Sequence, residues 1–315
     1  MDPRTQPAAI SPQIVPGLVS VLIVNWNGLA YLEACLRSIQ EMVAWPHEVI
    51  LLDNGSTDGS AAFVEREFPE VRLIRSEVNL GFIRGTNAAA LQARGEFLLL
   101  LNPDTILRTD IAMGVKLLQS DSSIGAVGAS AFTLDGKLRP NCGSYPTALR
   151  LILIESIFWD PYRGPHGPTE FGARKVDWVE GSWLLTPDRV WKKAGGLDER
   201  LIMYGEDVDY CRGIRECGLA SVQMPSLRYV HFGGFSPGRL PNVYAGFRWF
   251  HAKYSSRIHR RLAEIVMKLG LQTRVTIFGA FGSLLDNKKY RDRQQSALRV
   301  LEFWNRMGIP DTHIQ

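Results

Sequence analysis

Two aspartates follow runs of apolar residues, at positions where a carboxylate can bind a ligand. Asp104 comes after the run 97–101, and Asp53 comes after the run 49–52. Such uninterrupted runs are typical of strands buried on both faces of a parallel sheet. Because ligands bind at the carboxyl ends of the strands in these sheets, either carboxylate can contact a cation or a ligand hydroxyl there. The alternative is that each aspartate caps the next helix, expected near Thr109 and over 59–68.

Two further residues stand at predicted strand ends. Trp26 follows the strand predicted over 19–24 and offers an aromatic face to a nucleotide base; the alternative is core packing. His231 follows the strand predicted over 227–230 and can bind a metal ion or donate a hydrogen bond to a phosphate. The alternative for His231 is a purely structural role.

Asp207 lies near the start of a helix predicted over 206–217. It shares a helical face with the apolar residues of that helix, so we expect its carboxylate to point inward. A carboxylate held ionised by the helix dipole can act as a general base. The alternative is a buried carboxylate that only accepts hydrogen bonds from local amides. Asp209 falls on another face, where we expect it to pair with Arg212.

Predicted strands and helices alternate along the chain. Strands are predicted over 19–24, 49–52, 71–74, 97–101, 124–129, 176–185 and 227–230, with helices over 29–43, 59–68 and 86–93 and from Thr109. This alternation predicts βαβ units and a mostly parallel central sheet, an α/β fold. The chain lacks a G-x-G-x-x-G after its first strand and a G-x-x-x-x-G-K-[ST] loop, which argues against a dinucleotide oxidoreductase and a P-loop enzyme.

The composition is that of a soluble globular protein. The chain has 315 residues, of which 45% are hydrophobic and 22% are charged, and its formal net charge is +4. We find no secretion signal and no apolar run long enough to span a bilayer. The four cysteines form no CxxC pair, so we expect reduced thiols and a cytoplasmic location. Four prolines within residues 1–17 predict a disordered N-terminal tail.

The C-terminal third of the chain is basic. Residues 248–293 carry eleven Lys or Arg and three acids, a local charge of +8. Ile258, Leu262, Ile265 and Leu269 recur at helical spacing, and the basic residues lie largely off this stripe. Such a helix can bind an anionic membrane surface, which would place the protein on the cytoplasmic face of the membrane. The alternative is a helix packed on the rest of the protein. Binding to nucleic acid is not expected, because it leaves the acidic strand ends unexplained.

Six motifs, taken in order, resemble those of family 2 glycosyltransferases. They are Val-Leu-Ile-Val-Asn-Trp-Asn-Gly at 21–28, Leu-Asp-Asn-Gly-Ser-Thr-Asp at 52–58, Asn-Leu-Gly-Phe at 79–82, Leu-Asn-Pro-Asp at 101–104, Tyr-Gly-Glu-Asp-Val-Asp-Tyr at 204–210 and the segment 231–236. The resemblance covers about residues 18–236. Within the family, the chain is similar to bacterial rhamnosyltransferases of cell-surface polysaccharide synthesis.

The resemblance implies a GT-A fold. A Rossmann-like nucleotide-sugar-binding half, 18–129, is expected to join an acceptor-binding and catalytic half, 130–236, and a basic, mainly helical extension, 237–315, to follow. The implied activity is an inverting transfer of a sugar, rhamnose in the most similar subgroup. The implied donor is a dTDP- or UDP-linked nucleotide-diphospho-sugar, the acceptor is a hydroxyl of a glycan or lipid-linked molecule, and the cofactor is Mg²⁺ or Mn²⁺.

The same resemblance assigns roles to individual residues. Asp207 is the expected general base, His231 assists the leaving diphosphate, and Asp104 and His231 bind the metal ion. The expected nucleotide-sugar-binding residues are Val24, Trp26, Asp53, Asn79, Gly81, Asn87, Asn102 and Glu206. Asn102 stands where the metal motif of the family usually has an acid. The alternative function is therefore a nucleotide-sugar-binding protein with impaired catalysis.

Overall fold

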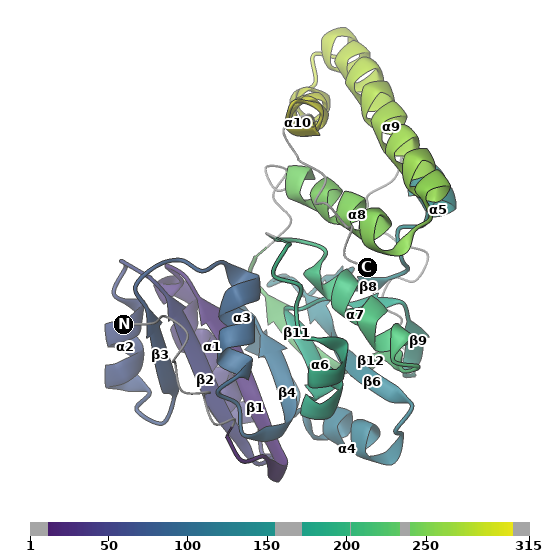
Figure 1. Ribbon diagram of the computed structural model, residues 1–315. Helices are drawn as coiled ribbons and strands as arrows, with labels where there is room; N and C mark the ends of the chain where they lie inside the picture. Colours follow the sequence, from purple (N-terminus) through teal and green to yellow (C-terminus); the bar gives the residue numbers. More distant parts are fainter. Residues whose placement is uncertain (1–11, 155–171, 202, 234–239, 305–315) are drawn as a thin grey trace, which may run out of the picture.

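A ten-stranded sheet forms the centre of the molecule (Figure 1). The computed structural model describes residues 12–154, 172–201, 203–233 and 240–304. The sheet order is β3-β2-β1-β4-β11-β6-β12-β5, with β7 beside β6 and β9 beside β12. Its strands are β1 (Val15–Asn25), β2 (His47–Asn54), β3 (Arg72–Ser76), β4 (Gly95–Leu101), β5 (Thr105–Leu107), β6 (Ile124–Phe132), β7 (Leu138–Arg139), β9 (Arg174–Val176), β11 (Trp183–Pro187) and β12 (Ala220–His231). A separate pair joins β8 (Cys142–Gly143) to β10 (Trp178–Val179).

The sheet is mixed and mostly parallel in its central part. Parallel pairs join β1 to β2 and β4, β2 to β3, and β6 to β12. Strand β11 lies antiparallel between β4 and β6. The α/β class and the mostly parallel sheet predicted from the alternation of elements are thus confirmed. The antiparallel direction of β11 could not be predicted, because an apolar run has the same pattern in both directions.

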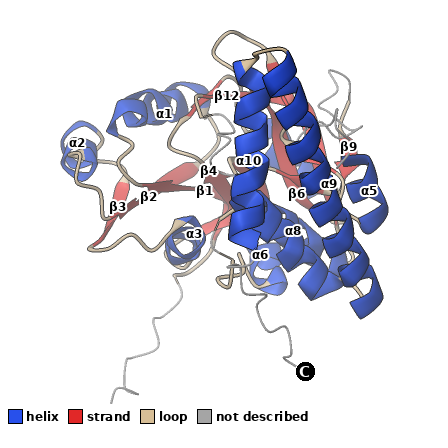
Figure 2. Cartoon of the chain, turned by 90° about the horizontal axis from the view of Figure 1, so that it is seen from above, coloured by secondary structure: helices blue, strands red, loops and turns tan. Residues whose placement is uncertain are grey.

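Helices cover both faces of the sheet because side chains of the central strands alternate between two apolar cores. Val21 and Leu99 belong to one core, and Leu22 and Leu98 belong to the other. The first core is covered by α1 (Leu29–Met42), α2 (Ser60–Glu67) and α4 (Ala112–Ser120). The second is covered by α3 (Phe82–Ala90), α6 (Asp188–Ala194) and α7 (Glu206–Glu216). Figure 2 shows α1 and α3 on opposite sides of the sheet.

Several boundaries differ from the predicted ones; β12, for example, begins at Ala220 and not at Leu227. Strand β1 begins at Val15, whose amide donates to the carbonyl of Arg94 (2.7 Å), so residues 15–17 of the predicted tail belong to the sheet. Residues 1–11 of that tail lie outside the described residues. Strand β6 continues through the expected border at 129/130, so the two halves share one sheet. The strand predicted over 176–185 is interrupted, because the chain bends at Asp177 and turns at 181–182.

A third apolar core lies outside the sheet. It joins α5 (Ala148–Ile154) to α8 (Leu240–Tyr254), α9 (Arg257–Leu284) and α10 (Lys288–Trp304). Leu151 of α5, Met267 of α9 and Trp304 of α10 are all buried in it. In Figure 1, α8 separates the sheet from α9 and α10. Among the described residues, no helix is both long and apolar enough to cross a bilayer.

The side of α9 that packs is not the side with the predicted stripe. Ala263, Met267 and Leu271 are completely buried. The stripe residues Ile258 and Leu262 are instead 79% and 44% exposed. The alternative of a helix packed on the rest of the protein is therefore confirmed for α9, but the face that packs is the one opposite the stripe.

Helix α8 is held to α7 by an ion pair whose carboxylate is buried and whose cation is partly exposed. Asp209 is only 4% exposed, and both of its carboxylate oxygens accept from Lys253 Nζ of α8 at 2.9 and 2.8 Å. The predicted pair of Asp209 with Arg212 is therefore wrong, because α8 covers that side of α7. Arg212 instead lies 3.5 Å from Glu216, one turn further along the same helix.

Replacing Lys253 with methionine is expected to lower the free energy of unfolding by about 3–5 kcal/mol at neutral pH, because it leaves the Asp209 carboxylate buried without its cation. Burial raises the pKa of Asp209 and Lys253 opposes this rise, so the variant should protonate Asp209 more readily. The loss of unfolding free energy should therefore become smaller as the pH falls. Urea unfolding followed by circular dichroism measures this loss.

The matched control is Arg37→Met, which removes an exposed pair with Glu33 on α1 (2.9 Å). It should cost no more than about 0.5 kcal/mol. Equal losses in the two variants would show that the Asp209 carboxylate does not need Lys253.

Candidate active site

Asp104 and His231 meet beyond the carboxyl end of β4. The pairing of β5 with β12 places Thr105 opposite His231, and the Phe232 amide donates to the Asp104 carbonyl (2.9 Å). This register brings His231 Nε2 to 3.2 Å from Asp104 Oδ1. Residues from two distant motifs of the sequence thus share one site, although 234–236 of the last motif lie outside the described residues.

The surroundings of Asp104 keep its carboxylate ionised. Burial opposes ionisation, but the contact and the electrostatic attraction of His231 outweigh burial, and the pKa of Asp104 lies below its usual value. A side chain at Gly233 would not fit, because its Cβ would lie 2.3 Å from Asp104 Oδ2. Arg139 holds the same loop by donating to the carbonyl oxygens of His231 and Gly233.

The helix-capping alternative for Asp104 is wrong. Helix α4 begins at Ala112, and the Ala112 amide donates to Asp110 Oδ1 at 3.3 Å. Asp104 is separated from that helix by β5 and is therefore available to a ligand.

Asp207 lies in the first turn of α7, as predicted. Its Oδ1 accepts from the Val208 amide (2.8 Å) and its Oδ2 lies 3.4 Å from the Gly181 amide. Burial raises the pKa of Asp207, and the negative charge of Glu180 raises it further. The pKa of Glu206 is also raised, by burial and by Asp207. Asp207 therefore takes up a proton more easily than an ordinary aspartate does.

Glu180 is a site residue that the sequence analysis missed. Its Oε1 lies 4.0 Å from His231 Nδ1, and its Oε2 is buried without a hydrogen-bond partner among the described residues. Glu180 is therefore close to His231, and its charge also acts on Asp207. It was hidden inside the predicted strand 176–185, whereas the turn signal Gly181-Ser182 could have revealed it.

Trp26 is exposed at the carboxyl end of β1, so the core-packing alternative is wrong. It is 59% exposed. The loop around it is fixed by Ser56, whose Oγ accepts from the Asn27 amide (2.9 Å) and from Asn25 Nδ2 (3.2 Å). The aromatic face of Trp26 is thus presented by an ordered loop at the edge where ligands bind in open α/β sheets.

Asp53 is buried at the carboxyl end of β2. Its two oxygens accept from Asn25 Nδ2 and from the Ser56 amide, both at 3.1 Å. Each carboxylate oxygen has a further lone pair for a ligand. The helix-capping alternative for Asp53 is wrong, because Asp58 accepts from the Ser60 amide at the start of α2 (3.0 Å).

The loop of Asn79 and Gly81 is attached to the end of β2. Asn54 Nδ2 donates to Asn79 Oδ1 (2.9 Å), and Asn54 Oδ1 accepts from the Leu80 amide (2.7 Å). Gly81 has φ 81°, which a residue with a side chain rarely adopts. Val24 is buried nearby, and a Cβ on Gly85 would lie 2.9 Å from its Cγ1. These residues therefore lie together at the carboxyl ends of β1 and β2.

Asn87 forms hydrogen bonds within the protein, with the loop after α6. Its Nδ2 donates to the carbonyl of Leu197 (2.9 Å) and to Glu199 Oε1 (3.0 Å), and its Oδ1 accepts from the Leu197 amide (3.0 Å). Both amide hydrogens are therefore used within the protein. Asn87 therefore has a structural role in connecting α3 to the loop after α6, and its contact with the nucleotide-sugar stays a prediction.

The residues around Asp104 fit a divalent cation that is shared with a diphosphate. Asn102 Oδ1 is buried and has no hydrogen-bond partner among the described residues. An amide oxygen and an ionised carboxylate are ligands that Mg²⁺ and Mn²⁺ accept. No group of three or more His, Cys, Asp or Glu within the described part of the chain is arranged to hold a metal ion. The remaining ligands would have to come from the diphosphate and from water.

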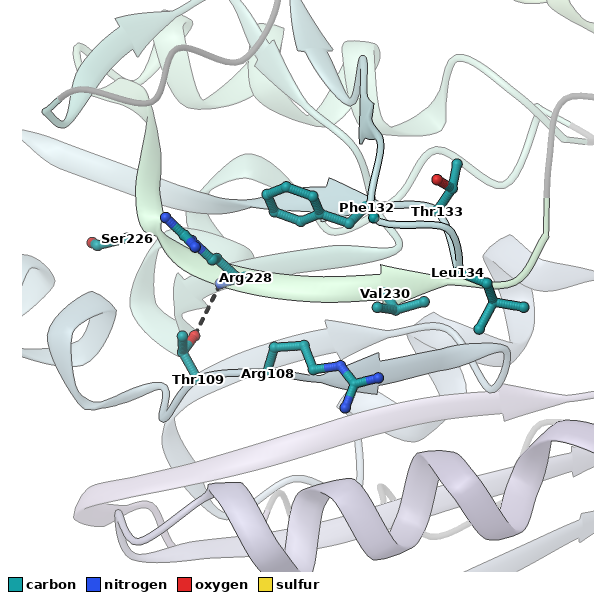
Figure 3. Close-up of a pocket in the computed structure, with 9 residues that line it drawn as sticks. Arg108, Thr109, Phe132, Thr133, Leu134, Ser226, Arg228 and Val230 are labelled. Carbon is teal, nitrogen blue, oxygen red and sulfur yellow. Dashed lines mark hydrogen bonds between the residues drawn. The ribbon is translucent and has the colours of Figure 1, made fainter.

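A cavity of about 600 Å³ lies away from this site (Figure 3). It is lined by Arg108, Phe132 and Arg228, among others, and the Arg228 amide donates to Thr109 Oγ1 (2.9 Å). Because side chains alternate along β12, Arg228 faces the opposite side of the strand from His231. None of the predicted site residues lines this cavity, so it is separate from the crevice at the strand ends.

Comparison of the sequence with known proteins identifies the family of this chain. A sequence profile of Glycosyl transferase family 2 matches residues 20–165. The chain is 30% identical over 244 residues to an N-acetylglucosaminyl-diphospho-decaprenol L-rhamnosyltransferase of Mycobacterium tuberculosis, a match that covers 71% of this chain and 79% of the relative. The chain belongs to glycosyltransferase family 2. This family 2 glycosyltransferase is also 27% identical to a chondroitin synthase of Escherichia coli, over 52% of this chain and 24% of that one.

Solved structures share the fold at low sequence identity. A mannosyltransferase of Pyrobaculum calidifontis, solved with GDP-Man and Mn²⁺, has 16% identity and a TM-score of 0.58, covering 90% of this chain and 84% of that one. GalNAc-T7, solved with UDP, GalNAc and Mn²⁺, has 17% identity and a TM-score of 0.55, covering 79% of this chain and 54% of that one. The family 2 enzyme therefore has the GT-A fold that its motifs implied.

Proposed function

We propose that this glycosyltransferase moves L-rhamnose from a dTDP- or UDP-linked donor to a hydroxyl of a lipid-linked glycan, with inversion at the anomeric carbon. One observation carries the mechanism: Glu180 lies 4.0 Å from His231, which contacts Asp104, and its charge also raises the pKa of Asp207, so residues from different elements belong to one site. The choice of sugar and acceptor is supported by the 30% identical relative, which is named as a rhamnosyltransferase acting on a decaprenol-linked substrate.

Asp207 is the proposed general base. Inverting transfer needs a carboxylate that accepts the proton of the acceptor hydroxyl while that oxygen attacks the sugar. Two backbone amides orient Asp207, and burial with the nearby Glu180 charge makes it more basic than an ordinary aspartate. Only one catalytic carboxylate is required, in contrast to the paired acids of a glycoside hydrolase.

The opposite side of the site is proposed to bind the donor. Trp26 would stack on the base, Asp53 would accept from a base N–H or a ribose hydroxyl, and Asp104 with Asn102 would hold Mg²⁺ or Mn²⁺ at the diphosphate. A bound cation supplies positive charge that stabilises the leaving diphosphate. His231, fixed against Asp104, would donate a hydrogen bond to the same leaving group.

Transfer of label from dTDP-[¹⁴C]rhamnose to polyprenyl-diphospho-N-acetylglucosamine tests the proposal. We expect labelled product in the organic phase, and nuclear magnetic resonance should show opposite anomeric configurations in donor and product. A thermal-shift panel of nucleotide-sugars with and without Mn²⁺ identifies the donor independently. A donor that raises the melting temperature but is never transferred to any acceptor would favour the alternative of a nucleotide-sugar-binding protein.

The rate of transfer should rise with pH through a pKa above the ordinary aspartate value of about 4, because the base acts as a carboxylate and its pKa is raised. Glu180→Gln removes a neighbouring negative charge, so it should move this rise to lower pH. Glu216→Gln, at the far end of α7, should not move it. Profiles of kcat/KM against pH make the comparison. An unmoved profile in Glu180→Gln would contradict the proposed influence of Glu180 on Asp207.

A further inference from the structure

Helix α9 has apolar side chains on two opposite faces, but only one face is packed. Its inner face enters the third core through Ala263, Met267 and Leu271, which are completely buried. We define the outer stripe as Ile258, Leu262, Ile265 and Leu269, which are 79%, 44%, 56% and 56% exposed. These four residues follow one another at alternating steps of four and three, so they form one line about 17 Å long. Such a line of large exposed aliphatic side chains indicates a contact surface.

Basic residues lie along one side of the outer stripe. Arg257, Arg261 and Lys268 each immediately precede a stripe residue, so all three are turned about 100° from the stripe in the same direction. All three are exposed. The acid in the corresponding position before Ile265 is Glu264, which lies 3.6 Å from Arg248 Nη2 and is thereby drawn toward the protein. The outer face therefore presents aliphatic side chains beside positive charge.

The far end of α9 repeats this combination. Phe281, Leu284 and Leu285 are 45%, 79% and 60% exposed. They are followed by exposed Lys288 and Lys289 at the start of α10. Figure 1 shows that α9 stands on the side of α8 away from the sheet, so a broad flat partner could contact α9 without reaching the crevice.

We infer that the outer face of α9 docks on an anionic lipid bilayer surface. The chemistry of the face selects this partner, because aliphatic side chains enter the acyl boundary while adjacent Lys and Arg attract anionic headgroups. The helix lies on the bilayer and does not cross it, in agreement with the absence of a spanning helix among the described residues. This docking does not depend on which sugar is transferred or on catalysis.

Co-sedimentation of the full chain with vesicles tests the docking. We expect binding to vesicles of equal parts phosphatidylcholine and phosphatidylglycerol, little binding to pure phosphatidylcholine, and partial release by high salt. Combining Arg257→Glu, Arg261→Glu and Lys268→Glu should lower the vesicle partition coefficient by roughly 100-fold or more. Arg260 is left unchanged because it lies 4.0 Å from Glu264, away from the stripe.

A second variant separates the apolar contribution from the charge. Ile258→Gln, Leu262→Gln and Leu269→Gln together should abolish the binding that survives high salt. The matched control changes Leu91, Met113 and Leu134 to Gln; these are 71%, 50% and 66% exposed and lie outside the helices of the third core. The control should bind vesicles as the wild type does. Thermal shifts with the donor should be unchanged in every variant, which separates failure of docking from failure of the proposed function.

Three results would overturn the docking. The first is a wild-type chain that does not bind anionic vesicles, and the second is an outer-stripe variant that binds them as well as the control does. The third is a wild-type chain that is a dimer without lipid and becomes a monomer in the outer-stripe variant. The last result would assign the face to a second copy of the chain. If a variant fails to fold, an environment-sensitive dye on Leu262→Cys, in a Cys217→Ser background, gives the answer instead. Its emission should shift to the blue with anionic vesicles, and no shift would contradict the docking.

Discussion

Replacing Asp207 with asparagine is expected to lower the rate of glycosyl transfer by roughly 10²–10⁴-fold, the usual range for loss of a general base. Asparagine keeps the shape of the side chain and can still accept from the Val208 amide, so the start of α7 should remain intact. Donor binding, measured by thermal shift, should stay close to that of the wild type. Single-turnover transfer from the labelled donor measures the loss.

The control for this variant is Glu216→Gln. Glu216 lies at the opposite end of α7 and its side chain is 53% exposed, so transfer should not change. The pH dependence of transfer through the raised pKa should also be absent in Asp207→Asn. Turnover at the wild-type rate in Asp207→Asn would end the assignment of this residue as the base.

Replacing Asp104 with alanine is expected to lower transfer by roughly 10²–10³-fold, because a cation at a leaving diphosphate contributes several kcal/mol of charge stabilisation. Donor binding should weaken by about tenfold when Mn²⁺ is present and change little when it is absent. Isothermal titration with and without Mn²⁺ separates the two conditions.

Asp110→Ala is the matched control for Asp104→Ala. Asp110 accepts from the Ala112 amide at the start of α4, so its loss should not alter the effect of Mn²⁺ on donor binding. If a chelator leaves the rate of the wild-type enzyme unchanged, the assignment of Asp104 to a metal ion is wrong.

Local sequence patterns predicted the parts of the fold that depend on neighbouring residues. The runs 49–52 and 97–101 became strands of the parallel core because their apolar side chains enter both cores. The motifs then located Asp104 and His231, which the pairing of β5 with β12 brings to 3.2 Å. Trp26 was also placed correctly at an exposed strand end.

The errors concern side chains whose partners lie far along the chain. Asp209 was paired with Arg212 of its own helix, although Lys253 of α8 neutralises it. The hydrogen bonds of the Asn87 amide to residues near 197 were likewise not predicted. Glu180 was missed because its importance comes from His231, a neighbour only in space. Helical spacing also predicted the stripe of α9, but only the packing of the opposite face showed that the stripe is exposed.

Ribosomal synthesis completes α5 when about half of the chain is still to be made, although the other described members of its apolar core belong to the last three helices. Ala148 and Leu151 share an apolar core with residues as late as Val300 and Trp304. During translation these side chains remain uncovered, and contacts between such distant segments form slowly. A chain that stops before α10 keeps an apolar surface that chaperones and proteases recognise. The C-terminal core therefore forms only after α10 has been made, and until then the chain is open to chaperones and proteases.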